Sequence, residues 1–310
     1  MAKKISRLIG IIIIVFILSK LNFAEIKTIF WEVDKHYLFI GLALTIIIIF
    51  IKSLRWNYLM QKQEIKYSLI DSFFMYSAST LLGTVTPGRI GDLSKIFYLK
   101  TDGHSYGKSA TSVILDRLFD ILFLLIAGTI GMLFFLNVFK NAIPYVSIFT
   151  VGLLILFYLV IKNELTKKIL SKILNFLIPE KYQKSWQLNL HDFIGEFKKL
   201  KLKHYFFVLF LTIFSWFAYY VQMLIFAKSL GINIPFLYLA ISGTVAGLVA
   251  MIPISYFGIG TRDLVLIALF SLISISKESA VAISSLVLST HAVMAVWGLI
   301  CWFKKPIRLG

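Results

Sequence analysis

The sequence has little charge, few acidic residues and a single cysteine, and each shortage excludes a class of protein. Only 15% of its 310 residues are charged and 59% are apolar, with a mean hydropathy of +0.85. This composition lies far from that of a water-soluble domain and excludes one. The single cysteine, Cys301, excludes a disulfide framework and a cysteine-based metal site.

Acidic residues are fewer than half as many as basic ones. The chain has 15 Asp and Glu against 32 Lys and Arg, a formal net charge of +17. The basic residues stand in short segments between apolar runs, which suits anionic lipid headgroups better than nucleic acid. We therefore expect membrane lipids as partners, and no nucleic acid.

The sequence is rich in apolar runs long enough to cross a bilayer, for which about 20 helical residues are needed. Four such runs carry no formal charge: residues 121–139, 141–161, 205–227 and 279–303. Two shorter runs, 8–19 and 36–51, are flanked by lysines that can snorkel and by interfacial Trp and Tyr. We predict six full transmembrane helices.

The run at 8–19 follows three basic residues, Lys3, Lys4 and Arg7, an arrangement that also opens secretory signal peptides. A signal peptide needs small residues at its cleavage site, and residues 19–23 lack that pattern. We therefore expect an uncleaved first span.

Proline and glycine interrupt two further apolar regions. Residues 72–86 run into the sequence PGRIGD at 87–92, and residues 229–261 are charge-free but contain both prolines and glycines. Proline removes a backbone donor, and glycine permits a reversal of the chain. Unsatisfied backbone at membrane depth is tolerated only beside protein or a wet cavity. We predict that each region is a pair of half-helices joined at a break that lines a cavity.

Lys and Arg in the loops orient the chain. Most of them lie at the N-terminus and in residues 52–66, 95–108, 162–203 and 304–308, whereas the segments around 22–35, 140, 228–235 and 277 are poor in net positive charge. By the positive-inside rule the first group is cytoplasmic, and so are both termini. The six spans fit only if the first broken pair enters from the cytoplasmic side and the second from the outside.

Two broken hairpins of opposite orientation are typical of an inverted repeat with a site near the bilayer midplane, as in transporters. We predict one all-α polytopic domain in the cytoplasmic membrane, with repeat halves at 1–162 and 204–310. The segment between them, 163–203, is predicted to be a basic cytoplasmic linker. Its lysines and interleaved apolar residues fit either amphipathic helices on anionic lipid or a solvated connection.

Three stretches carry a resemblance to a known family: TPGRIGD at 86–92, LDRLFD at 115–120 and IPISYFGIGTRD at 252–263. In order and spacing they resemble the lysylphosphatidylglycerol synthase transmembrane-region family, also called flippase-like, over nearly the whole chain. The resemblance implies a flippase for a lipid or lipid-linked sugar, as in the membrane half of the multiple peptide resistance factor. The 310 residues do not include the soluble aminoacyl transferase domain of the two-part proteins.

The resemblance also implies which residues form the site. The first turn of the family pattern matches Pro87, Gly88, Arg89 and Gly91, followed by Asp92 where the family often has glutamate. The acid and arginine pair matches Asp116 and Arg117. The second turn matches Pro253, Gly258, Gly260 and Arg262, with Asp263 at the acidic position.

The chemistry of moving a phosphate through hydrocarbon gives two of these residues a role. A buried anion is costly unless protein donors replace its water. Half-helices that begin at the breaks would direct free N–H groups inward, with Arg89 and Arg262 in their first turns. Because the arginine fork suits phosphate, we expect both to bind the headgroup. In the alternative interpretation they only pair with Asp92 and Asp263.

Other polar residues within the apolar runs have two interpretations. As ionisable residues within a span, Asp116, Arg117 and Asp120 are candidates for the transport site. For Asp116 and Arg117 we favour an interhelical clamp that ties the half-helices to the scaffold. We expect His291 to be an interhelical hydrogen-bond partner rather than a proton-coupling group, and Thr261 to be a helix N-cap. A further set, Trp216, Tyr219, Tyr220 and Gln222, either lines or packs a cavity.

Two rival functions belong to other classes. Asp116 and Asp120 are spaced to hold Mg²⁺ for prenyl or phosphatidyl transfer, but Arg117 lies between them and the other carboxylates are scattered. A non-transporting scaffold for cell-envelope synthesis is the second rival. We predict a flippase rather than an enzyme, without cofactor or metal, whose partner is an anionic phospholipid or lipid-linked substrate. A homo-oligomer or a partner synthase is compatible with the sequence.

Overall fold

The computed structural model describes residues 27–28, 31–162, 195–196, 200–251 and 260–305, with the backbone alone at 85, 87–90, 156–157 and 160–162. The elements in these ranges are helices. In chain order they are α3 (Lys35–Lys62), α4 (Leu69–Val85), the 3-10 helix η1 (Pro87–Ser94), α5 (Lys95–Thr101), α6 (Tyr106–Leu133), α7 (Leu136–Phe139), α8 (Ile143–Lys162), α11 (Leu202–Ser229), α12 (Phe236–Ala250), α13 (Thr261–Ser271) and α14 (Lys277–Lys304).

Three helices, α3, α11 and α14, are long and apolar enough to cross a membrane, with 28 residues each. At 1.5 Å per residue each extends about 42 Å, more than the hydrocarbon core of roughly 30 Å. They contain the predicted spans 36–51, 205–227 and 279–303, which are confirmed as helical. The predicted span 8–19 lies outside the described residues.

The two remaining predicted spans fall in α6 and α8. Helix α8 matches the prediction of 141–161 closely, but the predicted bounds 121–139 of the other span are wrong. Helix α6 begins at Tyr106 and ends at Leu133. The first half of α6 contains charged residues, so a charge-free run begins well after the start of the helix. These charges are tolerated inside the helix because they pair with residues of other helices.

Side-chain caps fix where several helices begin. Ser68, Ser105 and Ser276 each precede a helix and accept a hydrogen bond from the backbone N–H three residues further on. Asp34 caps α3 by accepting from two backbone N–H groups of its first turn. Such caps satisfy donors that the first turn of a helix leaves unpaired.

The first interrupted region is two helical parts, as predicted. Helix α4 ends at Val85, and η1 begins at Pro87 and leads directly into α5. Between them Thr86 has an extended backbone, with φ −116° and ψ 140°. Proline at the first position of η1 cannot supply the N–H that would continue α4.

The second interrupted region forms α12 and α13, and Pro253 and Gly258 lie between them, outside the described residues. The prediction of Thr261 as the N-cap is wrong by one position. Thr261 is the first residue of α13, and the cap is Gly260, whose φ of +86° favours glycine. Asp263 completes this start, because its carboxylate accepts from the Gly260 N–H at 2.8 Å.

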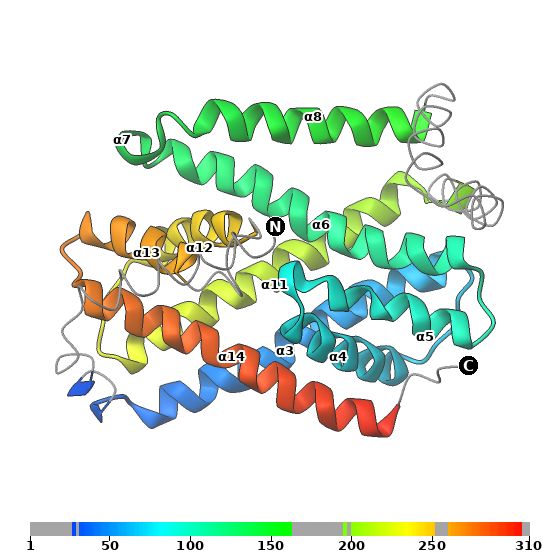
Figure 1. Ribbon diagram of the computed structural model, residues 1–310, viewed down its shortest axis with the longest axis horizontal. Helices are drawn as coiled ribbons and strands as arrows, with labels where there is room; N and C mark the ends of the chain where they lie inside the picture. Colours follow the sequence, from blue (N-terminus) through cyan, green and yellow to red (C-terminus); the bar gives the residue numbers. More distant parts are fainter. Residues whose placement is uncertain (1–26, 29–30, 163–194, 197–199, 252–259, 306–310) are drawn as a thin grey trace, which may run out of the picture.

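Figure 1 shows the long helices lying along the long axis of the molecule, with α4 and α5 toward the right end and α12 and α13 toward the left. The ends of α3, α8 and α14 and the starts of α6 and α11 share the right end, so the described Lys-rich connections gather there. The connections that follow α6, α11 and α13 share the left end. This sorting agrees with the charge-based assignment of two sides, and the direction of insertion stays a prediction.

Apolar clusters pack both short pairs onto long helices. Phe226 of α11, Phe270 of α13 and Ile283 of α14 are fully buried in one cluster. In another, Trp56 of α3 and Leu99 of α5 are fully buried. The short helices are thus held by the long ones rather than standing alone in lipid.

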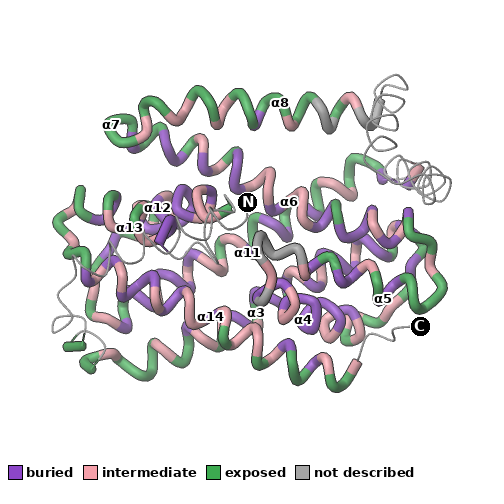
Figure 2. The backbone as a smooth tube through the Cα atoms, in the orientation of Figure 1, coloured by how far each residue is buried: buried purple, intermediate pink, exposed green. Residues whose placement is uncertain are grey.

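Beside these apolar clusters, several charged side chains are buried while large apolar side chains lie on the surface. Arg55 and Asp116 are fully buried and Lys95 is 1% exposed, whereas Tyr145 of α8 and Phe206 of α11 are 76% and 63% exposed. Figure 2 shows α8 exposed along most of its length. An apolar surface around an interior that also holds charged groups suits hydrocarbon as the surrounding medium, and the chain is therefore a membrane protein.

The arrangement of the ends predicts the topology. In a protein whose native cysteine is replaced by alanine (Cys301→Ala), Lys62→Cys should react with a membrane-impermeant maleimide only from the cytoplasmic side. Lys140→Cys, on the connection after α6, should react only from the outside. Labelling of both positions from one side of intact cells would contradict the topology and the inverted repeat with it.

Candidate functional site

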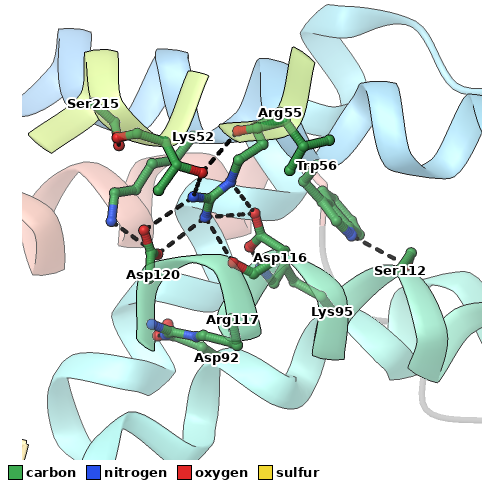
Figure 3. A network of polar contacts seen from close by, with 12 residues as sticks. Lys52, Arg55, Trp56, Asp92, Lys95, Ser112, Asp116, Arg117, Asp120 and Ser215 are labelled. Carbon is green, nitrogen blue, oxygen red and sulfur yellow. Dashed lines mark hydrogen bonds and ion pairs between the residues drawn. The ribbon is translucent and has the colours of Figure 1, made fainter. Parts of the chain in front are cut away.

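The most buried charged group is the Arg55 guanidinium of α3, which reaches α6 and α11 (Figure 3). Its Nε donates to Asp116 Oδ1 at 2.8 Å, and its two terminal nitrogens donate to the Asp120 carboxylate at 3.0 Å each. The Asp116 backbone carbonyl and the Thr212 hydroxyl accept the other two bonds, both at 2.9 Å. All five donors of the arginine are therefore satisfied.

Two lysines complete the cluster around the carboxylates. Lys95, at the start of α5, donates to Asp116 Oδ2 at 2.7 Å, and its ammonium lies 4.1 Å from the centre of the Tyr76 ring. Lys52, one turn before Arg55 on α3, donates to Asp120 Oδ2 at 3.0 Å. The Lys52 side chain is 20% exposed, whereas that of Lys95 is 1% exposed.

Helix α6 presents its charged residues on two faces. Asp116 and Asp120 are four residues apart and both face α3, as helical spacing requires. Arg117 points instead toward η1, where it forms an ion pair with Asp92, a residue 2% exposed (Figure 3). Asp116 and Arg117 therefore connect α5 and η1 to the long helices, which is the arrangement that an interhelical clamp needs.

Two glycines let η1 fold back against the end of α4. A Cβ on Gly91 would lie 2.1 Å from the Leu82 carbonyl oxygen, and one on Gly83 would lie 2.1 Å from Asp92 Oδ1. The Thr86 hydroxyl accepts from the Gly91 N–H at 2.7 Å and fixes the turn. The side chains of the other motif residues of this turn, among them Arg89, are outside the described part, and so is any Arg89–Asp92 pair.

The second break has a group of its own on α13 and α14. Arg262 is 5% exposed and donates from Nε to the Ser284 hydroxyl at 2.8 Å and from Nη2 to the Ser284 carbonyl at 3.0 Å. The Ser284 hydroxyl donates to Asp263, whose carboxylate also lies 3.6 Å from Arg262. Arg262 and Asp263 thus pair and share one serine of α14.

The described site residues that were predicted lie mainly in two groups, one on α6 and η1 and one on α13 and α14. The first group contains three further residues that were not predicted from the sequence. Lys52, Arg55 and Lys95 fell in segments assigned to cytoplasmic loops, but all three lie in helices, and Arg55 and Lys95 are fully or almost fully buried. A signal was available: Lys52 and Arg55 are spaced for one helix face and are followed by Trp56, within an apolar sequence. His291 lies on α14 and is half-buried.

Of the residues expected to line or pack a cavity, Tyr220 lines a pocket, Trp216 belongs to the charged cluster and Gln222 joins two helices. Trp216 Nε1 donates to Asp120 Oδ1 at 3.2 Å, so its indole belongs to the charged cluster. Gln222 donates to the Gly41 carbonyl at 2.7 Å and to the Thr45 hydroxyl at 2.9 Å, which joins α11 to α3.

Comparison with known proteins agrees with the sequence motifs. The family model described as "Lysylphosphatidylglycerol synthase TM region" matches residues 5–298, a range that includes all three motif stretches. A UPF0104 membrane protein of Pyrococcus horikoshii is 21% identical over 307 residues, which covers 92% of each chain. No solved structure was found to match.

The close approach at Gly91 predicts a specific loss of stability. Gly91→Ala should lower the free energy of unfolding by about 1–3 kcal/mol, because the added methyl group meets backbone that cannot rotate away. Gly152→Ala in α8 is the matched control, since a Cβ there meets nothing within 4 Å. Denaturant titration in detergent micelles measures both, and equal stability of the two variants would contradict the packing of η1 on α4.

The ion pair between η1 and α6 predicts energetic coupling. In a double-mutant cycle, Asp92→Ala and Arg117→Ala should show a coupling free energy of about 1–2 kcal/mol, because each single change leaves a charge near a buried site. The exposed pair Lys108–Glu64, 3.1 Å apart, provides the control cycle and should couple by less than about 0.5 kcal/mol. Additive effects at Asp92 and Arg117 would show that the pair does not hold η1.

Proposed function

The chain belongs to the lysylphosphatidylglycerol synthase transmembrane-region family, and from this premise we propose that it is a lipid flippase. It would move the headgroup of a phospholipid or polyprenyl-linked (glyco)lipid across the cytoplasmic membrane by alternating access. The two halves, 1–162 and 204–310, would be inverted repeats that rock about the charged cluster.

The observation that carries the proposal is the buried cluster of Arg55, Lys95, Asp116 and Asp120 among helices whose outer surface is apolar. Ionisable residues at membrane depth are costly, and they typically mark the path of a polar substrate or an ion. The cluster also joins the long helices, which a scaffold of this fold would need too. Its concentration of charge at membrane depth is what favours transport over a scaffold.

The sign of the cluster favours an anionic substrate. Four cationic side chains, Lys52, Arg55, Lys95 and Arg117, accompany three carboxylates, those of Asp92, Asp116 and Asp120, so the group carries one net positive charge. A phosphate that enters the hydrocarbon needs a compensating charge and hydrogen-bond donors. We expect the headgroup to be drawn to this region.

The breaks supply the elements that would move. Helix η1 is held to α6 by the pair Asp92–Arg117, and α13 is held to α14 by contacts of Arg262 and Asp263 with Ser284. An arriving phosphate would compete with Ser284 for Arg262 and let the second break shift against α14, while Arg89 would offer the phosphate a second site at the first break. The remaining motif residues, Pro87, Gly88, Pro253 and Gly258, would shape the two breaks.

The membrane transferase is less well supported. A metal site needs carboxylate oxygens that face a cation, but the oxygens of Asp116 and Asp120 already accept from Arg55, Lys52, Lys95 and Trp216. Within the described residues no group of three or more His, Cys, Asp or Glu side chains is placed to hold a metal ion. We therefore keep transport as the function to test.

Transport should depend on Arg262 as a headgroup ligand. In vesicles containing fluorescent phosphatidylglycerol, Arg262→Ala should slow flipping about tenfold or more, and Arg262→Lys should restore it in part, because an ammonium keeps the charge but loses the fork. Arg89→Ala should behave in the same way. Ser284→Ala is the matched control: it removes the hydroxyl that Arg262 contacts while keeping the cation, and it should leave most of the rate.

One result would contradict this assignment, and two others would count against the flippase itself. If Ser284→Ala is as slow as Arg262→Ala at equal folded yield, the arginine is only a structural partner. If a chelator of divalent cations stops turnover of the wild-type protein and Asp120→Asn abolishes it, the transferase interpretation gains over the flippase. Wild-type protein that does not accelerate flipping of any phospholipid or polyprenyl phosphate tested would overturn the proposal.

A further inference from the structure

An apolar pocket of about 210 Å³ lies between α6, α11 and α12. Its wall on α6 is formed by Phe123, Ala127, Ile130 and Phe134, which follow one another at helical spacing. From Phe123 to Phe134 this face runs about 16 Å along the helix, roughly half the thickness of a bilayer's hydrocarbon core. The residues that line the pocket are therefore spread along a helix face about as long as one leaflet's chains.

The outer part of the pocket opens to the lipid-facing surface. Ile130 and Phe134 are 53% and 65% exposed, and they stand on the helix end away from the Lys-rich end of the molecule. The polar atoms on the opposite wall are already satisfied: Tyr220 and Thr244 share a hydrogen bond of 2.5 Å, and Thr244 donates to the Ala240 carbonyl. The lining therefore suits a hydrocarbon better than a polar ligand.

The inner part of the pocket adjoins the charged cluster through one tryptophan. The Phe123 ring stacks on the Trp216 ring, with centroids 5.4 Å apart and planes inclined by 15°. On the cluster side Trp216 donates to Asp120, and the Lys52 ammonium lies 5.3 Å from the centre of its ring. A cation thus lies close to the ring that backs the apolar wall.

Lys52 is the cation of this cluster that a ligand in the pocket would reach. Arg55 has all five donors engaged and is fully buried, Lys95 is 1% exposed, and Arg117, although 23% exposed, points toward η1. The Lys52 side chain keeps 20% of its surface exposed and lies beside Trp216. Its ammonium suits a phosphate oxygen as a point charge.

We infer that the pocket between α6, α11 and α12 binds a hydrocarbon chain of the lipid substrate while Lys52 binds the phosphate of the same molecule. This inference rests on the proposed function and deepens it. The bound lipid lies with its phosphate toward the Lys-rich end and its chain toward the opposite end. That is the orientation of a lipid taken from the leaflet that faces the Lys-rich end.

Photolabelling of the full-length protein in vesicles tests the inference. The probe is phosphatidylglycerol with a diazirine at the end of one acyl chain, and mass spectrometry locates the labelled residues. In the wild-type protein the label should fall around Ile130 and Phe134 at the end of α6 and around Ile241 of α12, which line the same pocket. Ala127→Trp, which fills the pocket, should reduce this labelling about tenfold, since several buried methylenes lose their site.

A neighbouring residue provides the matched control. Ile126 is 43% exposed and does not line the pocket, so Ile126→Trp adds the same bulk to the same helix and should leave the labelling unchanged. Lys52→Gln should weaken labelling by phosphatidylglycerol but not by a diacylglycerol probe with the same chains. Glycerol phosphate, a soluble headgroup without chains, should not displace either probe.

Three results would overturn the inference: equal labelling of the two tryptophan variants, a wild-type label elsewhere on the protein, or displacement of the probe by glycerol phosphate. Labelling measures binding without transport, so it separates the two proposals. Flipping by a protein that is not labelled at the pocket would refute the pocket and leave the flippase. Pocket labelling of a protein that flips no lipid would refute the flippase alone.

Discussion

The five hydrogen bonds of the Arg55 guanidinium are the interaction on which the rest of the structure depends. They join α3 to α6 and α11 at the depth where no water can replace a lost partner. Asp116 and Asp120 lie there among three cations, since Arg55, Lys52 and Lys95 surround them. Removing the arginine would leave two buried carboxylates without the positive charge that balances them. In buried networks such a loss lowers the free energy of unfolding by roughly 3–5 kcal/mol.

The two breaks are attached to this frame by bonds of different strength. In the first half, η1 and α5 are held through full charges, Asp92 with Arg117 and Lys95 with Asp116. In the second half, Arg262 and Asp263 meet α14 through the hydroxyl and carbonyl of Ser284. Bonds between two charged groups are generally stronger than those to a neutral partner. We therefore expect the second break to move at lower cost, and the first to stay with the long helices.

The sequence predicted the helices, both breaks and the sorting of basic segments, because these follow from local rules of hydropathy, proline, glycine and loop charge. It missed Lys52, Arg55 and Lys95, since a basic residue is assigned to a loop unless its carboxylate partner is known. Those partners, Asp116 and Asp120, lie on another helix and are more than 20 residues away in the chain from each of the three basic residues. The early start of α6 was missed for the same reason.

The proposed function requires a charged surface directly beside an apolar one, and Trp216 lies where the two meet. A bare boundary between them would leave either the charges without partners or the hydrocarbon against unsatisfied polar atoms. The indole has a polar N–H and an apolar ring. Its N–H bonds Asp120, one ring face stacks with Phe123 of the pocket, and Lys52 lies near the ring as a cation partner. A phosphate and its chain, joined by covalent bonds, can then occupy both surfaces at once without either surface being exposed to the wrong environment.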